Sequence, residues 1–334
     1  MRSALNPPSL TGLPSEKTLA SFRKPPIGAA LRASAALFVL VALYVSFLTR
    51  PEWIWISVPL YCVVLLYFGL IALHEACHGT LSEYRWVNLV FAHGFDILVG
   101  ISSQQYRIKH MIHHSYTNID RWDNDLDTDG ALRLSPKEAW RPYHRYQALY
   151  APFLYALITI TWGPYYDLKR LWTGTIGKKK VVFKRSDIAI QLGLKFVHFF
   201  IFLYLPYRLY GLSAIGTYFV AHAFFGIAIA LIFQVAHITS DCAFFDESKK
   251  VTQWDSHQVA TSANFSTDSS FSNFFFGGLN YQGIHHLYPN ISYLHFPRVN
   301  RELKAKSVKL IEYPSFTRAA FAHFKHLNQM GRRP

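Results

Sequence analysis

Residues 53–73 read WIWISVPLYCVVLLYFGLIAL, and residues 74–78 directly after them read HEACH. An uncharged apolar run of this length is long enough to cross a bilayer as a helix. Three further runs of similar character lie at residues 29–48, 188–206 and 212–236. The sequence therefore predicts an all-α integral membrane protein with four transmembrane helices.

The composition of the 334 residues agrees with a membrane protein. Hydrophobic residues make up 51% and charged residues 16%, whereas a soluble domain carries about 25% charged residues. This composition excludes a disordered chain, a coiled coil and an ordinary soluble enzyme. The 34 basic residues exceed the 20 acidic ones and give a net charge of +14. In an apolar chain this excess favours basic cytoplasmic loops on anionic lipid, and we expect no nucleic-acid partner.

Basic residues also predict the orientation in the membrane. Residues 167–187 carry seven Lys and Arg side chains, so this loop is expected on the cytoplasmic side, together with both termini. The four spans then form two hairpins, and residues 86–103 and 146–166 are expected to be interfacial or re-entrant helices. In an alternative with six spans, these two segments would cross the membrane and place His78 and His110 on opposite faces.

The sequence predicts one membrane domain with a tail at each end. Residues 1–28 are polar and rich in Pro and Ser, and are expected to form a mobile cytoplasmic tail. The membrane domain is predicted over residues 29–310. Residues 311–334 are predicted to be a polar C-terminal tail.

Histidine is unusually frequent, with sixteen residues, and three clusters stand out. They read HEACH at residues 74–78, HMIHH at residues 110–114 and QGIHH at residues 282–286. Residues three and four apart share one face of a helix, so the histidines of each cluster point together. Imidazole suits Fe, Zn, Cu and Ni, and seven histidines are too many for one tetrahedral zinc. The clusters therefore predict a cytoplasmic His-rich cap that holds two metal ions.

In this order, the three clusters resemble the histidine boxes of the membrane-bound fatty acid desaturase family. KHMIHHSYTNID at residues 109–120 and GGLNYQGIHHLYP at residues 277–289 resemble bacterial acyl-CoA desaturases, and Gln282 resembles the front-end group. The resemblance covers roughly residues 30–310. It implies an O2-dependent oxidoreductase with two iron ions that introduces a double bond into a fatty acyl chain carried by CoA, a lipid or a carrier protein. A separate donor such as ferredoxin or cytochrome b5 is expected to supply two electrons.

The resemblance also implies a set of metal ligands. Seven lie in the clusters and the eighth ends the fourth apolar run: His74, His78, His110, His113, His114, His237, His285 and His286. Four further residues are expected to support these ligands through hydrogen bonds or water: Gln282, Gln234, His257 and Asp125.

Other functions fit parts of this pattern. A hydroxylase or an acetylenase can use the same site, because the outcome depends on sub-ångström placement of the substrate. The first cluster by itself matches the H-E-x-x-H signature of zinc peptidases, with Glu75 as general base, but that interpretation leaves the other two clusters unexplained. A metal transporter predicts ligands along a transmembrane path, whereas these clusters are expected at one face.

Overall fold

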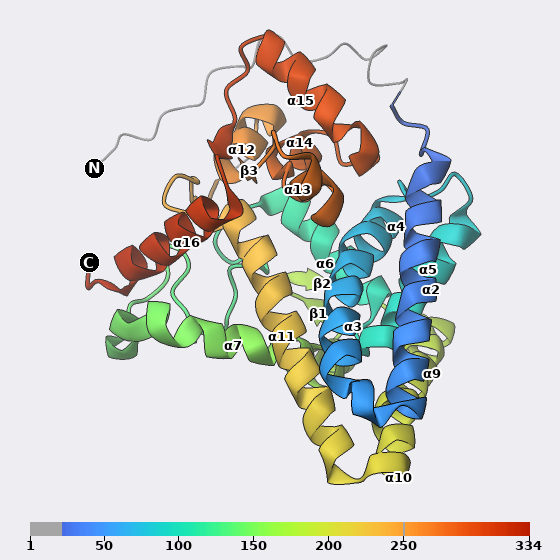
Figure 1. Cartoon of the computed structure of the whole chain (residues 1–334). Helices are drawn as coiled ribbons and strands as arrows, with labels where there is room; N and C mark the ends of the chain where they lie inside the picture. Colours follow the sequence, from blue (N-terminus) through green and yellow to red (C-terminus); the bar gives the residue numbers. More distant parts are fainter. Residues whose placement is uncertain (1–21, 250) are drawn as a thin grey trace. The chain divides into compact units, whose positions relative to one another are not determined.

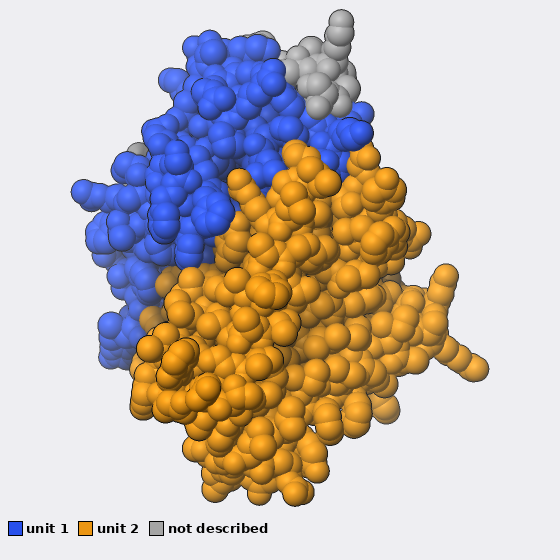
Figure 2. All heavy atoms as spheres, turned by 45° about the vertical axis from the view of Figure 1, so that its right-hand side comes forward, with its two compact units in different colours: residues 1–25, 111–149, 232–334 blue, residues 26–110, 150–231 orange. Residues whose placement is uncertain are grey.

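The computed structural model describes residues 22–249 and 251–334. The chain divides into two compact units (Figure 2). Unit 1 comprises residues 1–25, 111–149 and 232–334, and unit 2 comprises residues 26–110 and 150–231. Most of the predicted N-terminal tail lies outside the described residues. The domain limits at residues 28 and 310 stay predictions.

Unit 2 contains most of the long apolar helices. Among the described residues, four helices are long and apolar enough to cross a membrane: Ile27–Thr49, Pro51–His78, Arg185–Tyr210 and Leu212–His237. This finding confirms the predicted all-α membrane fold with four spans. The helical segments that begin in unit 2 are α2 (Ile27–Thr49), η1 (Pro51–Trp53), α3 (Ile54–Phe68), η2 (Gly69–Leu73), α4 (His74–His78), α5 (Arg85–Val99), α6 (Ser103–Tyr116), η4 (Trp162–Asp167), α8 (Leu168–Thr173), α9 (Arg185–Phe199), η5 (Phe200–Tyr204), α10 (Leu205–Tyr210) and α11 (Leu212–His237).

The spans pack through apolar side chains and a few polar contacts between helices. Helices α2 and α3 lie side by side (Figure 1). The hydroxyl of Tyr210 donates to the Leu48 carbonyl at 2.6 Å, and His198 Nε2 lies 2.8 Å from the Tyr218 hydroxyl, which joins α9 to α11. Large apolar side chains such as Trp55, 86% exposed, point away from the unit. Lipid accounts for this exposure, because these side chains meet acyl chains instead of water.

A sharp elbow joins α5 to α6, whose axes differ by 107°. A buried ion pair holds the elbow, since Lys195 Nζ donates at 2.7 Å both to the Gly100 carbonyl and to Asp167 Oδ2. The same Asp167 oxygen accepts the Ser102 N–H at 2.7 Å. These contacts therefore fix the direction of the first part of α6 relative to α5 within unit 2. Whether the bent pair is a re-entrant or interfacial element stays a prediction.

Unit 1 is built from short helices around a small parallel sheet. Strand β3 (Ala263–Phe265) pairs with β4 (Ile311–Tyr313), with Asn264 opposite Glu312. Helix α12 packs against α14, which places QGIHH in the interior (Figure 1). The helical segments that begin in unit 1 are η3 (Pro142–Tyr146), α7 (Gln147–Thr161), α12 (Trp254–Thr261), α13 (Ser270–Phe275), α14 (Gln282–Leu287), η6 (Tyr293–His295), α15 (Phe296–Ala305) and α16 (Phe316–Gly331). The other two strands, β1 (Thr175–Ile176) and β2 (Lys179–Lys180), form a hairpin in the basic loop of unit 2.

Candidate metal centre

Three histidines converge in unit 2. His74 and His78 lie one turn apart on α4, directly after the π-helical turn η2, and π turns are frequent at functional sites. His110 comes from α6, and its ring centroid lies 5.0 Å from that of His74 and 4.9 Å from that of His78. The potential ligand atoms of the three residues lie within 4.8 Å of one another. Two separate segments of unit 2 thus bring together three side chains that could hold a metal ion.

The closest contact in this cluster joins two ring nitrogens, His78 Nε2 and His110 Nε2, at 2.9 Å. Two nitrogens that bind one ion at about 2.1 Å and at right angles lie about 3 Å apart. The observed spacing fits this arrangement. The ring of Tyr106 stacks on His110 with 5.2 Å between the centroids, which restrains the orientation of that imidazole.

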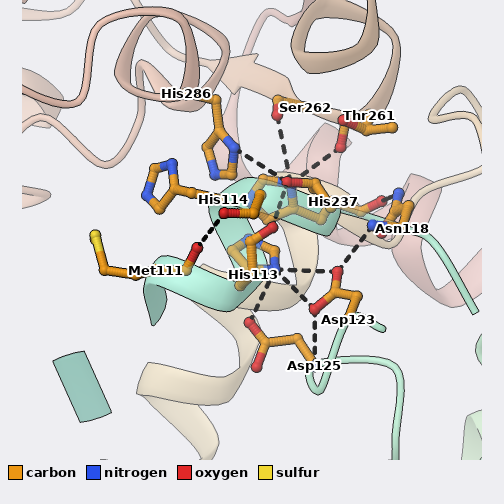
Figure 3. A network of polar contacts seen from close by, with 12 residues as sticks. Met111, His113, His114, Asn118, Asp123, Asp125, His237, Thr261, Ser262 and His286 are labelled. Carbon is orange, nitrogen blue, oxygen red and sulfur yellow. Dashed lines mark hydrogen bonds and ion pairs between the residues drawn. The ribbon is translucent and has the colours of Figure 1, made fainter. Parts of the chain in front are cut away.

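The other five predicted histidine ligands lie together in unit 1 (Figure 3 shows four of them). Three of these residues, from α6, α11 and α14, have potential ligand atoms within 4.8 Å of one another: His113, His237 and His286. The remaining two residues, His114 and His285, contact each other, with 3.0 Å between their Nε2 atoms. All five are buried. They come from three stretches that are far apart in the sequence, residues 113–114, residue 237 and residues 285–286, and the fold of unit 1 brings these stretches together.

Hydrogen bonds to oxygen atoms determine which nitrogen of each ring is available. Asp123 lies 2.9 Å from His113 Nδ1, the Thr261 carbonyl lies 3.0 Å from His237 Nδ1, and Gln258 Oε1 lies 2.9 Å from His286 Nδ1. Each of these oxygens can only accept, so each Nδ1 carries the proton and each Nε2 keeps its lone pair.

The clearest example of a ring nitrogen with a free lone pair is His286 Nε2. This atom is buried and has no hydrogen-bond partner in the described part of the chain. A buried nitrogen of this kind is costly unless a ligand satisfies it. Burial, together with the neighbouring imidazoles of His114 and His237, holds the pKa of His286 well below its usual range. The ring is therefore neutral, which is the form that binds metal, and the donor set fits a transition-metal ion.

The predicted supporting residues lie at different distances from the clusters. Gln282 Nε2 is 3.2 Å from His237 Nε2, and Asp125 Oδ2 is 3.3 Å from His113 Nδ1. Among the described residues, the ring of His257 forms no hydrogen bond with a histidine of either cluster. Its Nε2 lies 2.9 Å from the Thr117 carbonyl, and burial lowers its pKa to about 4. The side-chain oxygen of Gln234 is buried without a hydrogen-bond partner in the described residues.

Two supporting residues were not singled out from the sequence, Asp123 and Gln258. Asp123 lies in the loop after α6, where the left-handed residues Asn118 and Arg121 turn the chain and its carboxylate reaches His113. Gln258 lies on α12 and also donates from Nε2 to the His114 carbonyl at 2.9 Å. Neither contact follows from residue spacing.

Comparison with known proteins assigns the family. The model of the fatty acid desaturase family matches residues 52–317, a range that includes all three sequence clusters and both groups of candidate metal ligands. The chain belongs to the fatty acid desaturase family. This desaturase is therefore an oxidoreductase of the membrane, and its family membership favours that activity over the zinc-peptidase alternative.

Several curated relatives of this desaturase are named as acyl-lipid, linoleoyl-lipid or Delta(5) fatty acid desaturases. The acyl-lipid (8-3)-desaturase of Physcomitrium patens is 34% identical over 279 residues, which cover 79% of this chain and 57% of that protein. The sn-1 linoleoyl-lipid 6-desaturase of Synechocystis sp. is 33% identical over 273 residues, covering 78% and 75%. The Delta(5) fatty acid desaturase A of Dictyostelium discoideum is 31% identical over 289 residues, covering 80% and 61%.

Proposed function

We propose that this desaturase introduces a double bond into a fatty acyl chain, with O2 as oxidant and two electrons from a separate donor. The observation that carries the proposal is the pair of histidine clusters, one in each unit, in which ring nitrogens of three side chains lie within 4.8 Å of one another. A methylene C–H bond is inert to every protein side chain, so the oxidising power has to come from a bound cofactor.

The eight histidines of the two clusters are the proposed ligands of two iron ions, which supply the oxidation chemistry when bound. His74, His78 and His110 form one ligand set, and His113, His237 and His286 form another. Asp123, Gln258 and the Thr261 carbonyl orient the second set by accepting from Nδ1. Neutral imidazoles, unlike carboxylates, leave the ions highly charged and electrophilic.

The names of the relatives suggest the substrate class. The relatives in Physcomitrium patens and Synechocystis sp. are named for acyl-lipid and linoleoyl-lipid substrates, and we propose an acyl chain carried by a lipid, CoA or a carrier protein for this chain. The net charge of +14 would attract an acidic ferredoxin or cytochrome b5 to the cytoplasmic face. We place the histidine clusters and both termini on that face.

The first experiment compares acyl-chain profiles of cells that express the wild type, His285→Ala or His93→Ala. Mass spectrometry with double-bond localisation is expected to show a new unsaturated product with the wild type and with His93→Ala, since His93 lies outside both clusters and contacts Asp96 instead. His285→Ala is expected to give no product. A hydroxylated or acetylenic product would leave the proposed metal site intact but would show that the enzyme is a hydroxylase or an acetylenase.

Metal analysis of the purified protein tests the cofactor separately. We expect about two iron ions per wild-type chain and a reduced iron content in His285→Ala. A single zinc ion per chain, unchanged by His285→Ala, would contradict the di-iron proposal and would instead fit the H-E-x-x-H motif at His74 and His78.

A further inference from the structure

A groove in unit 1, away from the histidine clusters, lies between η3 and the C-terminal half of α16. Its volume is about 760 Å³. Four basic side chains line it, and no acidic residue does: Arg145, Lys325, Arg332 and Arg333. The metal centre uses none of these residues, so the groove is a separate feature of the molecule.

No acidic side chain of the described residues neutralises the positive charge of this groove. None of the four cations forms an ion pair within the described residues. Glu138, an acidic residue of the loop before η3, directs its carboxylate to the Leu134 N–H at 2.7 Å and is occupied there. Like charges gathered without a counter-charge repel one another, and an anionic ligand relieves that repulsion.

The groove wall is held in place by hydrogen bonds to the end of α16. Trp140 Nε1 donates to the Gly331 carbonyl at 2.8 Å, and Arg133 donates to the Met330 carbonyl at 2.9 Å. A Cβ at Gly331 would lie 2.6 Å from the His144 carbonyl, so α16 and η3 are in direct backbone contact. The last carbonyls of α16, which would otherwise attract the basic side chains, are already satisfied.

Apolar side chains are exposed beside the cations. Phe321 lines the groove and is 67% exposed, and Tyr146 and Leu149 on the adjoining segment are 56% and 75% exposed. Basic residues next to exposed aromatic and aliphatic residues are typical of protein surfaces that lie in the headgroup layer of an anionic membrane. An acidic protein partner would satisfy the charge but would leave no apolar phase for Leu149 and Tyr146.

We propose that this groove binds the headgroup of an anionic phospholipid. The guanidinium groups of Arg145 and Arg332 and the ammonium group of Lys325 contact the phosphate, since Arg in particular suits phosphate oxygens. Phe321 contacts the apolar part of the lipid below the phosphate. The site goes beyond the oxidation reaction, because it fixes unit 1 to one lipid class and does not depend on bound metal.

The test measures lipid retention by the purified full-length protein. Native mass spectrometry compares retained phosphatidylglycerol with retained phosphatidylcholine after incubation with equal amounts of both in detergent micelles. We expect the wild type to prefer phosphatidylglycerol, and the triple variant Arg145→Gln/Lys325→Gln/Arg332→Gln to lose about tenfold or more of that preference.

A matched control removes three exposed cations elsewhere in unit 1. The variant Arg301→Gln/Lys306→Gln/Lys309→Gln changes the net charge equally and is expected to keep the preference. Equal losses in both triple variants would show a general charge effect and would overturn the proposal. Equal unfolding temperatures of the two variants in detergent establish that both have folded, and this measurement does not depend on the di-iron proposal.

Two further measurements distinguish a bound phospholipid from a free anion. Phe321→Asn is expected to weaken retention of phosphatidylglycerol, and millimolar inorganic phosphate is expected to leave the lipid bound. Complete displacement by inorganic phosphate would show a site for free anions and overturn the lipid assignment. If the groove triple variant kept its lipid preference and lost binding of an acidic ferredoxin, the groove would instead be a protein-docking surface.

Discussion

At the scale of single residues, the candidate metal centre depends on which ring nitrogen carries the proton. Asp123 shows how this choice is made for His113. Its two carboxylate oxygens lie 2.9 and 3.0 Å from His113 Nδ1, and they also accept the N–H groups of Asn118 and Asp125. The carboxylate is therefore held by the backbone, and the imidazole is oriented before any ion binds.

Replacing Asp123 by Asn should weaken metal binding while the fold persists. The amide can donate to Nδ1, which would move the ring proton to Nε2 and block that atom as a ligand. We expect iron affinity to fall by about 10- to 100-fold, measured by competition with a chelator. Asp127→Asn, a change at an exposed carboxylate of the same loop, is the control and should bind iron as the wild type does. Unchanged affinity in Asp123→Asn would remove this residue from the centre.

At the scale of elements, the elbow between α5 and α6 orients the start of the helix on which three of the predicted histidine ligands lie. Helix α6 begins at Ser103, directly after the contacts of Lys195 and Asp167, and carries His110, His113 and His114 along one continuous helix. An error in the direction of α6 would displace all three histidines. The polar contacts of the elbow therefore matter for the site as well as for stability.

Removing one partner of the buried ion pair should be costly. Lys195→Met leaves the Asp167 carboxylate buried without its cation, although Arg170 Nη1 stays 3.3 Å away. A loss of about 3–5 kcal/mol in unfolding free energy is expected for a broken buried pair. Thermal unfolding in detergent measures the effect. The double variant Lys195→Met/Asp167→Asn should recover part of the loss, and a double variant less stable than Lys195→Met would contradict this explanation.

Two glycines of unit 2 allow a matched test of close packing. A Cβ at Gly163 would lie 2.2 Å from the Gly100 carbonyl, whereas a Cβ at Gly193 would meet no atom within 4 Å. Gly163→Ala should therefore force η4 away from the elbow and cost about 1–3 kcal/mol. Gly193→Ala, within α9, should be neutral or stabilise by up to about 1 kcal/mol. Similar unfolding temperatures for the two variants would show that η4 does not contact the elbow as described.

At the scale of the whole molecule, the distribution of charge predicts the orientation in the membrane. The loop between α8 and α9 contains the β1–β2 hairpin and most of the basic residues of that region, whereas the link between α2 and α3 is short. The positive-inside rule places the basic loop in the cytoplasm and the short link on the other side.

Labelling of single cysteines in intact cells tests this orientation. In a background in which Cys62, Cys77 and Cys242 are replaced by Ser, a membrane-impermeant maleimide should label Arg50→Cys but not Lys179→Cys. Permeabilised cells should show labelling of both. Labelling of Lys179→Cys from outside intact cells would invert the proposed topology.

The sequence by itself determined the membrane fold, the number of spans and the three histidine clusters. Each depends on neighbouring residues: a span needs an apolar run of sufficient length, and a cluster needs His residues three or four apart. His237 is the exception among the predicted ligands. It stands alone at the end of the apolar run at residues 212–236, so the family resemblance was needed to identify it.

Only the tertiary structure decided which distant residues meet. Long stretches of chain separate His113, His237 and His286, which nevertheless lie close together in the fold. Hydrogen bonds to Asp123, Gln258 and the Thr261 carbonyl keep the ring proton of each on Nδ1. The basic groove likewise joins Arg145 to Lys325. These contacts depend on how helices pack and where loops turn, and packing is a property of the folded chain as a whole, which local patterns in the sequence do not specify.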